Sequence, residues 1–187
     1  MLAFMALRDD LDRIAAAAGE FADLGETVAG VVPAEPEPGE RTYLCAYVAD
    51  EHHNWLVLDD SGRPLTSRDA VRRTVSITAM CELAEESAGG GELEELREKL
   101  VALRLTENPP GIEEAEEAAL ALEQAIGAPP RIAEPDYLDR IGAATRRLEE
   151  ALGPSGGSPF AEAMKQGIDA VDELTHDVEA GYKRTLE

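Results

Sequence analysis

Apolar side chains recur at helical spacing at the start of the chain. Between Phe4 and Phe21 they follow one another every three or four residues, which predicts one amphipathic helix over residues 2–24. Gly25 stands directly after this pattern, and glycine is the residue that most often ends a helix. We therefore expect the first helix to end there.

Strand patterns replace the helical spacing after this glycine. Residues 26–32 (ETVAGVV) are rich in β-branched side chains and predict a first strand that ends at Pro33. A proline-rich acidic loop (PAEPEPGE) is expected next. Residues 41–50 and 54–60 predict two further strands, and both faces of these strands are apolar. Other parts of the structure should therefore cover the sheet on both sides.

Short turns connect the strands and lead out of the sheet. Glu51, His52 and His53 lie between the last two strands and have the length of a hairpin loop. Residues 59–64 (DDSGRP) predict a second turn, in which Gly62 can adopt a positive φ angle. Both histidines are therefore expected in a solvated turn.

Helical patterns account for the rest of the chain. Thr66 and Asp69 form a T-x-x-D capping box that opens a helix over residues 67–88, and its apolar positions predict a central, mostly buried helix. Three glycines at residues 89–91 should end it. Ser158 is placed to cap the last helix. Four further apolar patterns, bounded by glycine and proline, run over residues 93–103, 115–125, 138–152 and 160–178.

These elements predict an α+β, mostly helical fold, in which a small antiparallel three-strand meander packs on helices and is followed by a helical bundle. We expect residues 1–90 to form an α+β domain and residues 91–187 a helical region, either semi-independent or continuous with the first part in one compact domain. Three strands cannot cover two apolar faces by themselves. Either the chain's own helices cover the second face or another copy does, and the second option predicts a C2 homodimer.

Charge narrows the classes of partner. The chain carries 39 acidic and 17 basic residues, a formal net charge of −22. Such a field repels phosphate backbones and anionic lipid, so we expect no nucleic acid and no membrane partner. A basic protein partner is compatible with it. No apolar run reaches the ~18 residues of a membrane span, and the apolar start of the chain lacks a basic leader region. We therefore expect a cytoplasmic protein.

The two cysteines predict no disulfide framework. Cys45 and Cys81 are few and far apart, and each stands inside an apolar run. Both are interpreted as small buried side chains, and the sequence leaves open whether they pair with each other.

The order helix, three-strand meander, helix over the first half of the chain, together with the negative charge, resembles the type III secretion chaperones, which are small acidic α+β proteins. No motif carries this resemblance. It implies a fold and nothing about function.

Histidines are the first candidates for chemistry. His52 and His53 are adjacent, and neighbouring side chains on an extended strand point to opposite faces, which disfavours one shared metal. A catalytic zinc site would also need a third protein ligand. Solvated turn histidines are the preferred interpretation, with metal binding or a pH-sensing role as alternatives.

Glu173 and His176 are the second candidates, as an E-x-x-H on the last helix. Carboxylate-rich four-helix proteins hold two metals with two such motifs and two further glutamates, whereas this chain has one. His176 also lies off the centre of the apolar stripe. A chance match in an acidic helix is the preferred interpretation.

Two further patterns contain a potential nucleophile. Residues 153–157 (GPSGG) match the letters of G-x-S-x-G, but a nucleophile elbow follows a strand, and here a helical pattern precedes it. Glu82, Glu85 and Glu86 follow Cys81 closely, and neighbouring carboxylates disfavour a reactive thiolate.

The sequence therefore favours a non-enzymatic protein-interaction or scaffold module that acts as a homo-oligomer or binds a basic partner, with no cofactor. The alternative is a metal- or small-molecule-binding protein, with or without enzyme activity, that uses His52 and His53, or Glu173 and His176, with nearby carboxylates.

Overall fold

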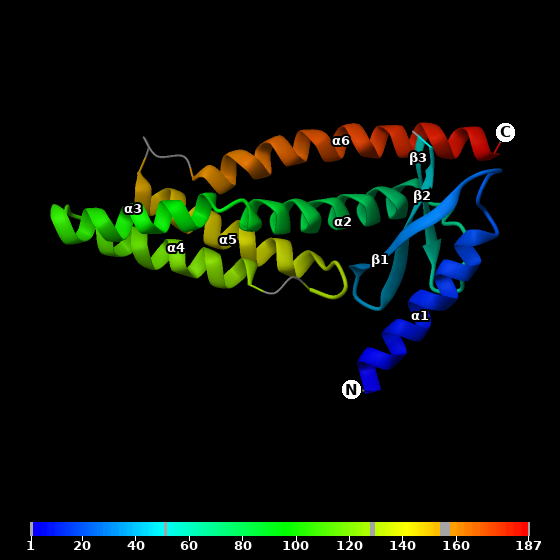
Figure 1. The fold of residues 1–187 in the computed structure, drawn as a ribbon, viewed down its shortest axis with the longest axis horizontal. Helices are drawn as coiled ribbons and strands as arrows, with labels where there is room; N and C mark the ends of the chain where they lie inside the picture. Colours follow the sequence, from blue (N-terminus) through cyan, green and yellow to red (C-terminus); the bar gives the residue numbers. More distant parts are fainter. Residues whose placement is uncertain (1, 51, 128–129, 154–157, 187) are drawn as a thin grey trace. The chain divides into compact units, whose positions relative to one another are not determined.

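The computed structural model describes residues 2–50, 52–127, 130–153 and 158–186 (Figure 1). Across these ranges the fold is α+β and mostly helical, with a three-stranded antiparallel meander of order β1-β2-β3, as the sequence predicts. The elements in chain order are α1 (Leu2–Gly19), β1 (Thr27–Glu37), β2 (Glu40–Ala49), β3 (His52–Asp59), α2 (Arg68–Gly89), α3 (Glu92–Thr106), α4 (Ile112–Ile126), α5 (Pro135–Leu152) and α6 (Pro159–Leu186). None of the described helices combines the length and apolar character needed to cross a membrane.

The chain forms two compact units. The first consists of Met1–Thr78, Arg131–Glu134 and Val171–Glu187, and the second of Ala79–Pro130 and Pro135–Ala170. Helices α2 and α6 each contribute to both units. Whether residues 1–90 and 91–187 behave as separate domains stays a prediction.

The first helix is shorter than its apolar pattern predicts. It ends at Gly19, because the last turn tightens: Glu20 and Phe21 donate their backbone N–H groups to the carbonyls three residues earlier. The hydroxyl of Tyr47 in the sheet donates a hydrogen bond to the Ala18 carbonyl at 2.9 Å, so this carbonyl at the helix end has a partner. Phe21 and Leu24 consequently lie outside the helix and are exposed.

The first strand is longer than predicted. The prediction of a proline-rich loop after Val32 is wrong for most of its length, because these residues belong to the strand. β1 continues through Pro33 to Glu37 as an edge strand of the sheet. Its outer edge pairs with a distant segment, since Ala133 donates its N–H to Pro33 and accepts one from Glu35, both at 2.9 Å. The missing N–H of Pro33 faces this outer edge, where the strand tolerates a proline. An irregularity in the register lies between Ala34 and Glu37.

The chain's own helices cover both faces of the sheet. On one face, a buried cluster joins Ile14 and Ala18 of α1 to strand residues including Tyr43 and Tyr47. On the other face, strand side chains pack with those of α2 and α6 in a second cluster, whose buried and partly buried members are Leu44, Val57, Val71, Val75, Val32, Trp55, Leu65 and Leu174. The predicted apolar faces are therefore satisfied within one chain.

The turns and caps agree with the sequence, with one shift. Gly62 has a φ of 80°, as the turn prediction requires. The helix cap moves from Thr66 to Ser67, whose Oγ accepts the N–H of Ala70 at 3.4 Å. Ser158 caps α6 as predicted, through the N–H of Ala161.

The second unit is a helical bundle. Three of the buried residues of α4 are alanines, and α4 packs against α5. Helix α3 packs along α4 (Figure 1). Tyr137 of α5 is buried and donates its hydroxyl to the carbonyl of Ile126 at 3.1 Å, which closes the C-terminal end of α4.

Candidate functional site

The adjacent histidines belong to a strand and not to a loop. His52 and His53 are the first residues of β3 and pair with Ala49 and Val48 of β2. The predicted hairpin loop is therefore wrong in length, because Asp50, with a φ of 47°, already makes the tight turn. Glu51 lies outside the described residues. Because successive strand residues point to opposite faces, the two exposed imidazoles diverge.

The acid and histidine of the last helix point away from the fold. Val171 and Thr175 are buried on the inner side of α6, whereas Glu173 and His176 are exposed. Within the ranges that the structure describes, no three His, Cys, Asp or Glu side chains gather closely enough to hold a metal ion. Metal binding by the four candidate residues stays a prediction with no geometric support.

Both cysteines are buried, and they are not joined by a disulfide bond. Burial raises the pKa of the Cys45 thiol to about 12, so this thiol stays protonated at neutral pH. A protonated thiol is a poor nucleophile.

The G-x-S-x-G match lies mostly outside the described residues, at 154–157. The part before it is described, and it is the helix α5, followed by Gly153 with a φ of 75°. A helix at this place lacks the strand that a nucleophile elbow needs.

A polar cavity of about 340 Å³ opens in the first unit. Its walls come from α1, the β1–β2 hairpin, strand β2 and the turn after β3, and the lining residues are Asp10, Arg13, Glu35, Gly39, Arg41, Tyr43 and Asp60. Segments distant in sequence thus bring five charged side chains to one hollow. No local motif links them.

Two arginines of this cavity share one carboxylate. Asp10 Oδ1 lies 3.3 Å from Arg13 Nη2, and its Oδ2 lies 3.6 Å from Arg41 Nη1. Arg13 also donates to the backbone carbonyl of Asp60 at 2.7 Å. The Glu35 carboxylate accepts the N–H of Gly39 at 2.7 Å. Both contacts of Asp10 are longer than the ~2.7–2.9 Å of strong charge-assisted bonds, so it holds the guanidinium groups loosely.

Tyr43 is the buried aromatic residue of the cavity wall, with 1% of its surface exposed. Desolvation raises the pKa of its hydroxyl, and the negative charge of Asp10 raises it further, while the hydrogen bond and charge of Arg41 oppose the rise. The hydroxyl is therefore a neutral hydrogen-bonding group at physiological pH.

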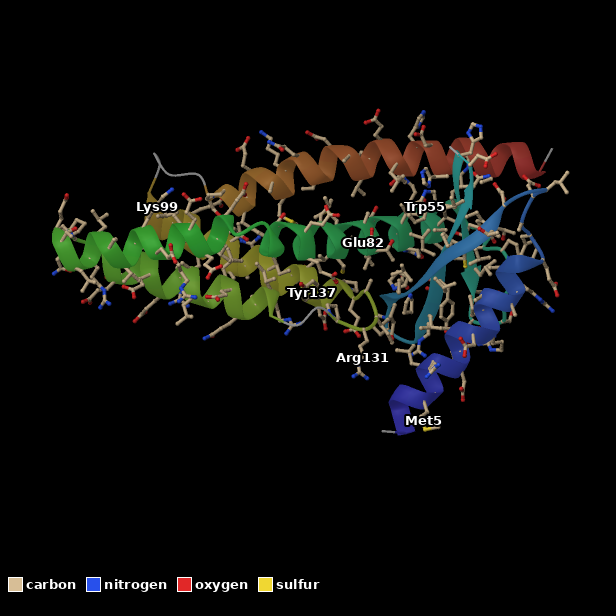
Figure 2. All side chains as sticks on the ribbon, in the orientation of Figure 1. Met5, Trp55, Glu82, Lys99, Arg131 and Tyr137 are labelled. Atoms are coloured by element: carbon tan, nitrogen blue, oxygen red, sulfur yellow. The ribbon has the colours of Figure 1, made fainter. Side chains whose placement is uncertain are left out.

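Ion pairs join α3 to α4 in the second unit. Arg97 pairs with Glu123, and Arg104 Nε lies 2.7 Å from Glu116 Oε2. Lys99 lies on α3, where its ammonium group is 2.8 Å from a carboxylate oxygen of Glu95 on the same helix (Figure 2). These are the three basic side chains of the two helices, against nine glutamates. Each of these three basic side chains is therefore paired with a glutamate of α3 or α4, two helices that together form a helical hairpin.

Apolar side chains lie on the same side of this helical hairpin as the ion pairs between α3 and α4. Val101 and Leu105 follow Arg97 at steps of four along α3, and Leu120 follows Glu116 by four along α4. Leu105 is 75% exposed and Leu120 is 44% exposed. We call Val101, Leu105 and Leu120 the leucine face.

Unpaired acids border the leucine face. Helical spacing places Glu94 and Glu98 beside it on α3, and Glu113 and Glu117 beside it on α4. All four are exposed, and none makes an ion pair with any residue that the structure describes. The surface combines exposed leucines with uncompensated negative charge.

Sequence reasoning missed both surfaces for different reasons. Leu105 and Leu120 stand off the apolar stripes of their helices, and that displacement was a signal available in the sequence. Arg13, Arg41 and Asp60 offered no signal, because they come from three elements that only the folded sheet brings together.

The chain matches no protein-family model, no curated protein and no solved structure. Function is therefore inferred from the chemistry of these surfaces.

Proposed function

We propose that the chain is a non-enzymatic, cytoplasmic protein-interaction module that binds a basic amphipathic helix through the leucine face of α3 and α4. The observation that carries this proposal is the exposure of Leu105 and Leu120 among the glutamates of two helices whose three bases are already paired. Exposed leucines contribute the apolar contact area, and the free carboxylates contribute attraction to Lys or Arg.

The shape of the surface favours a helical ligand. Helices α3 and α4 pack on each other and present rows of side chains at four-residue spacing. A third helix can pack apolar residues at i, i+3 and i+4 against such rows. Its flanking basic residues would then meet Glu94, Glu98, Glu113 and Glu117.

Charge argues against a second copy at this surface. Two identical acidic faces would bring like charges together, which costs free energy on association. The sheet gives no separate reason for a homodimer, because the helices of the same chain cover both of its faces. Homo-oligomerisation remains a prediction, and light scattering after size-exclusion chromatography tests it.

Fluorescence anisotropy tests the proposal with a labelled synthetic peptide that has leucines at i, i+3 and i+4 and lysines on the opposite face, so that it forms an amphipathic helix. We expect the double variant Leu105→Gln/Leu120→Gln to weaken binding at least about tenfold, which corresponds to ~1.4 kcal/mol. Leu24→Gln is the matched control, since Leu24 is a fully exposed leucine outside the hairpin, and it should leave binding unchanged.

The charge contribution is tested in the same assay. Glu94→Gln/Glu98→Gln should weaken binding and flatten its salt dependence more than Glu150→Gln/Glu162→Gln, which removes the same charge from α5 and α6. Equal binding of a peptide with the same composition in scrambled order would contradict the proposal. So would an unchanged affinity of the leucine double variant with native circular dichroism.

A further inference from the structure

The charges around the polar cavity of the first unit are of both signs. Arg13 and Arg41 supply guanidinium donors, and Asp10, Glu35 and Asp60 supply carboxylates. The lining therefore sums to one negative charge, from three acids and two bases. A simple anion would face the carboxylates, and a simple cation would face the guanidinium groups. Only a molecule that carries both charges can satisfy the two sets together.

The guanidinium groups of Arg13 and Arg41 have N–H donors that can bind a ligand. Arginine has five N–H donors, and Arg13 donates one hydrogen bond to Asp10 and one to the Asp60 carbonyl. Arg41 is engaged by Asp10 only at 3.6 Å and by the Tyr43 hydroxyl. A ligand carboxylate could accept shorter, better-aligned bonds from these arginines than Asp10 does.

The carboxylates on the other side of the cavity have no cationic partner among the described residues. Within the described part of the chain, Glu35 and Asp60 form no ion pair, and the hydrogen bond that reaches Glu35 comes from the neutral N–H of Gly39. An ammonium group entering the cavity would therefore meet carboxylates that retain their charge. A Cβ added at Gly39 would meet open space, so the backbone does not close this side.

We propose that this cavity binds a small zwitterion of the α-amino acid type. Its carboxylate is held by Arg13 and Arg41, and its ammonium group by Asp60 and Glu35, with the Tyr43 hydroxyl as a neutral hydrogen-bonding group on the wall. The volume of about 340 Å³ leaves room for such a molecule. This binding site is independent of the leucine face, since its residues belong to the other unit.

Isothermal titration calorimetry on the full chain tests the proposal with glycine, alanine, serine and glutamate as probes. Acetate and methylammonium, which each carry one of the two charges, are the matched half-ligands. We expect at least one amino acid to bind at least about tenfold more tightly than either half-ligand, because both charges are satisfied together.

Two variants locate the binding. Arg41→Gln removes the carboxylate contact and Asp60→Asn removes an ammonium contact, and each should raise the dissociation constant at least about tenfold. Arg147→Gln, on the exposed side of α5, removes the same charge outside the cavity and should leave binding unchanged. Circular dichroism verifies folding, and two independent variants keep the test informative if one of them fails to fold.

Several results would overturn the inference. Absence of heat with all four amino acids at millimolar concentration would do so. Acetate binding as tightly as the amino acids would instead indicate an anion site. Unchanged affinity in folded Arg41→Gln and Asp60→Asn would place any binding elsewhere on the chain.

Discussion

Asp59 organises the turn between β3 and α2 with a single carboxylate oxygen. Its Oδ1 accepts the backbone N–H groups of Ser61 and Arg63, both at 2.9 Å, and the Ser61 hydroxyl at 2.6 Å. Burial alone would raise the pKa of this carboxyl, but the hydrogen bonds from Ser61 and Arg63 outweigh it and lower the pKa. The ionised side chain thus stabilises the folded turn.

Replacing this carboxylate should destabilise the protein in a pH-dependent way. We expect Asp59→Ala to lower the free energy of unfolding by about 1–2 kcal/mol at neutral pH, because three hydrogen bonds lose their acceptor. Since the folded pKa is lowered, this stabilisation is present above the unfolded pKa of ~3.9 and is lost as the pH falls through the folded value. Urea unfolding of both proteins from pH 3 to 7 measures it. A constant difference across that range would contradict the assignment.

Residue-scale predictions succeeded where local chemistry decides the outcome. Gly62 adopts the positive φ that its turn requires, and Ser158 caps the last helix. They failed where a tertiary contact competes. The helix that should reach Gly25 stops at Gly19, because Tyr47 from the sheet takes the Ala18 carbonyl.

The turn after β3 packs unusually closely on the first helix. A Cβ built on Gly62 would lie 2.9 Å from the Cβ of Ala17, whereas one on Gly39 would meet nothing within 4 Å. Both glycines have a φ of 80°. The two positions therefore share backbone strain and differ in steric contact.

Replacing each of these two glycines with alanine separates the cost of backbone strain from the cost of steric contact. We expect Gly39→Ala to cost about 1 kcal/mol, the usual penalty of a left-handed residue. Gly62→Ala should cost about 1–3 kcal/mol more, because the turn or α1 must shift to admit the methyl group. Chemical denaturation of the matched pair measures the difference. Equal costs would indicate that the turn and the helix are not packed together.

The ends of α2, α3, α4 and α5 followed the sequence, where glycine or proline stops a regular pattern. The edge strand β1 is an exception, as α1 is, since Pro33 and its neighbours predict a loop. The strand continues because Ala133 pairs with its outer edge. A residue about a hundred positions away supplies that partner, and no local pattern can report it.

The net charge of −22 acts on the whole molecule. Only a few of its carboxylates pair with bases in the described structure, as with Arg73 and Glu37. The remaining acids repel one another, and folding brings them closer together. Salt should therefore stabilise this protein by screening that repulsion.

Thermal unfolding in sodium chloride tests this property. We expect the melting temperature to rise between low and physiological ionic strength, and to rise more at neutral pH than near the sequence pI of about 4.4, where the net charge is small. Chloride is preferred to sulfate, which stabilises proteins by exclusion from their surface. A melting temperature independent of sodium chloride at neutral pH would contradict the prediction.

The sequence by itself determined the α+β class, the three-strand meander, the order of the helices and the acidic character, because hydrophobic periodicity, turn residues and charge are local properties. Tertiary structure alone decided how the sheet is covered, where β1 ends and which charged side chains share a cavity. Those outcomes depend on contacts between residues far apart in the chain, such as Asp10 with Arg41 and Pro33 with Ala133. Such contacts form only when the whole chain has folded, so no stretch of sequence encodes them separately.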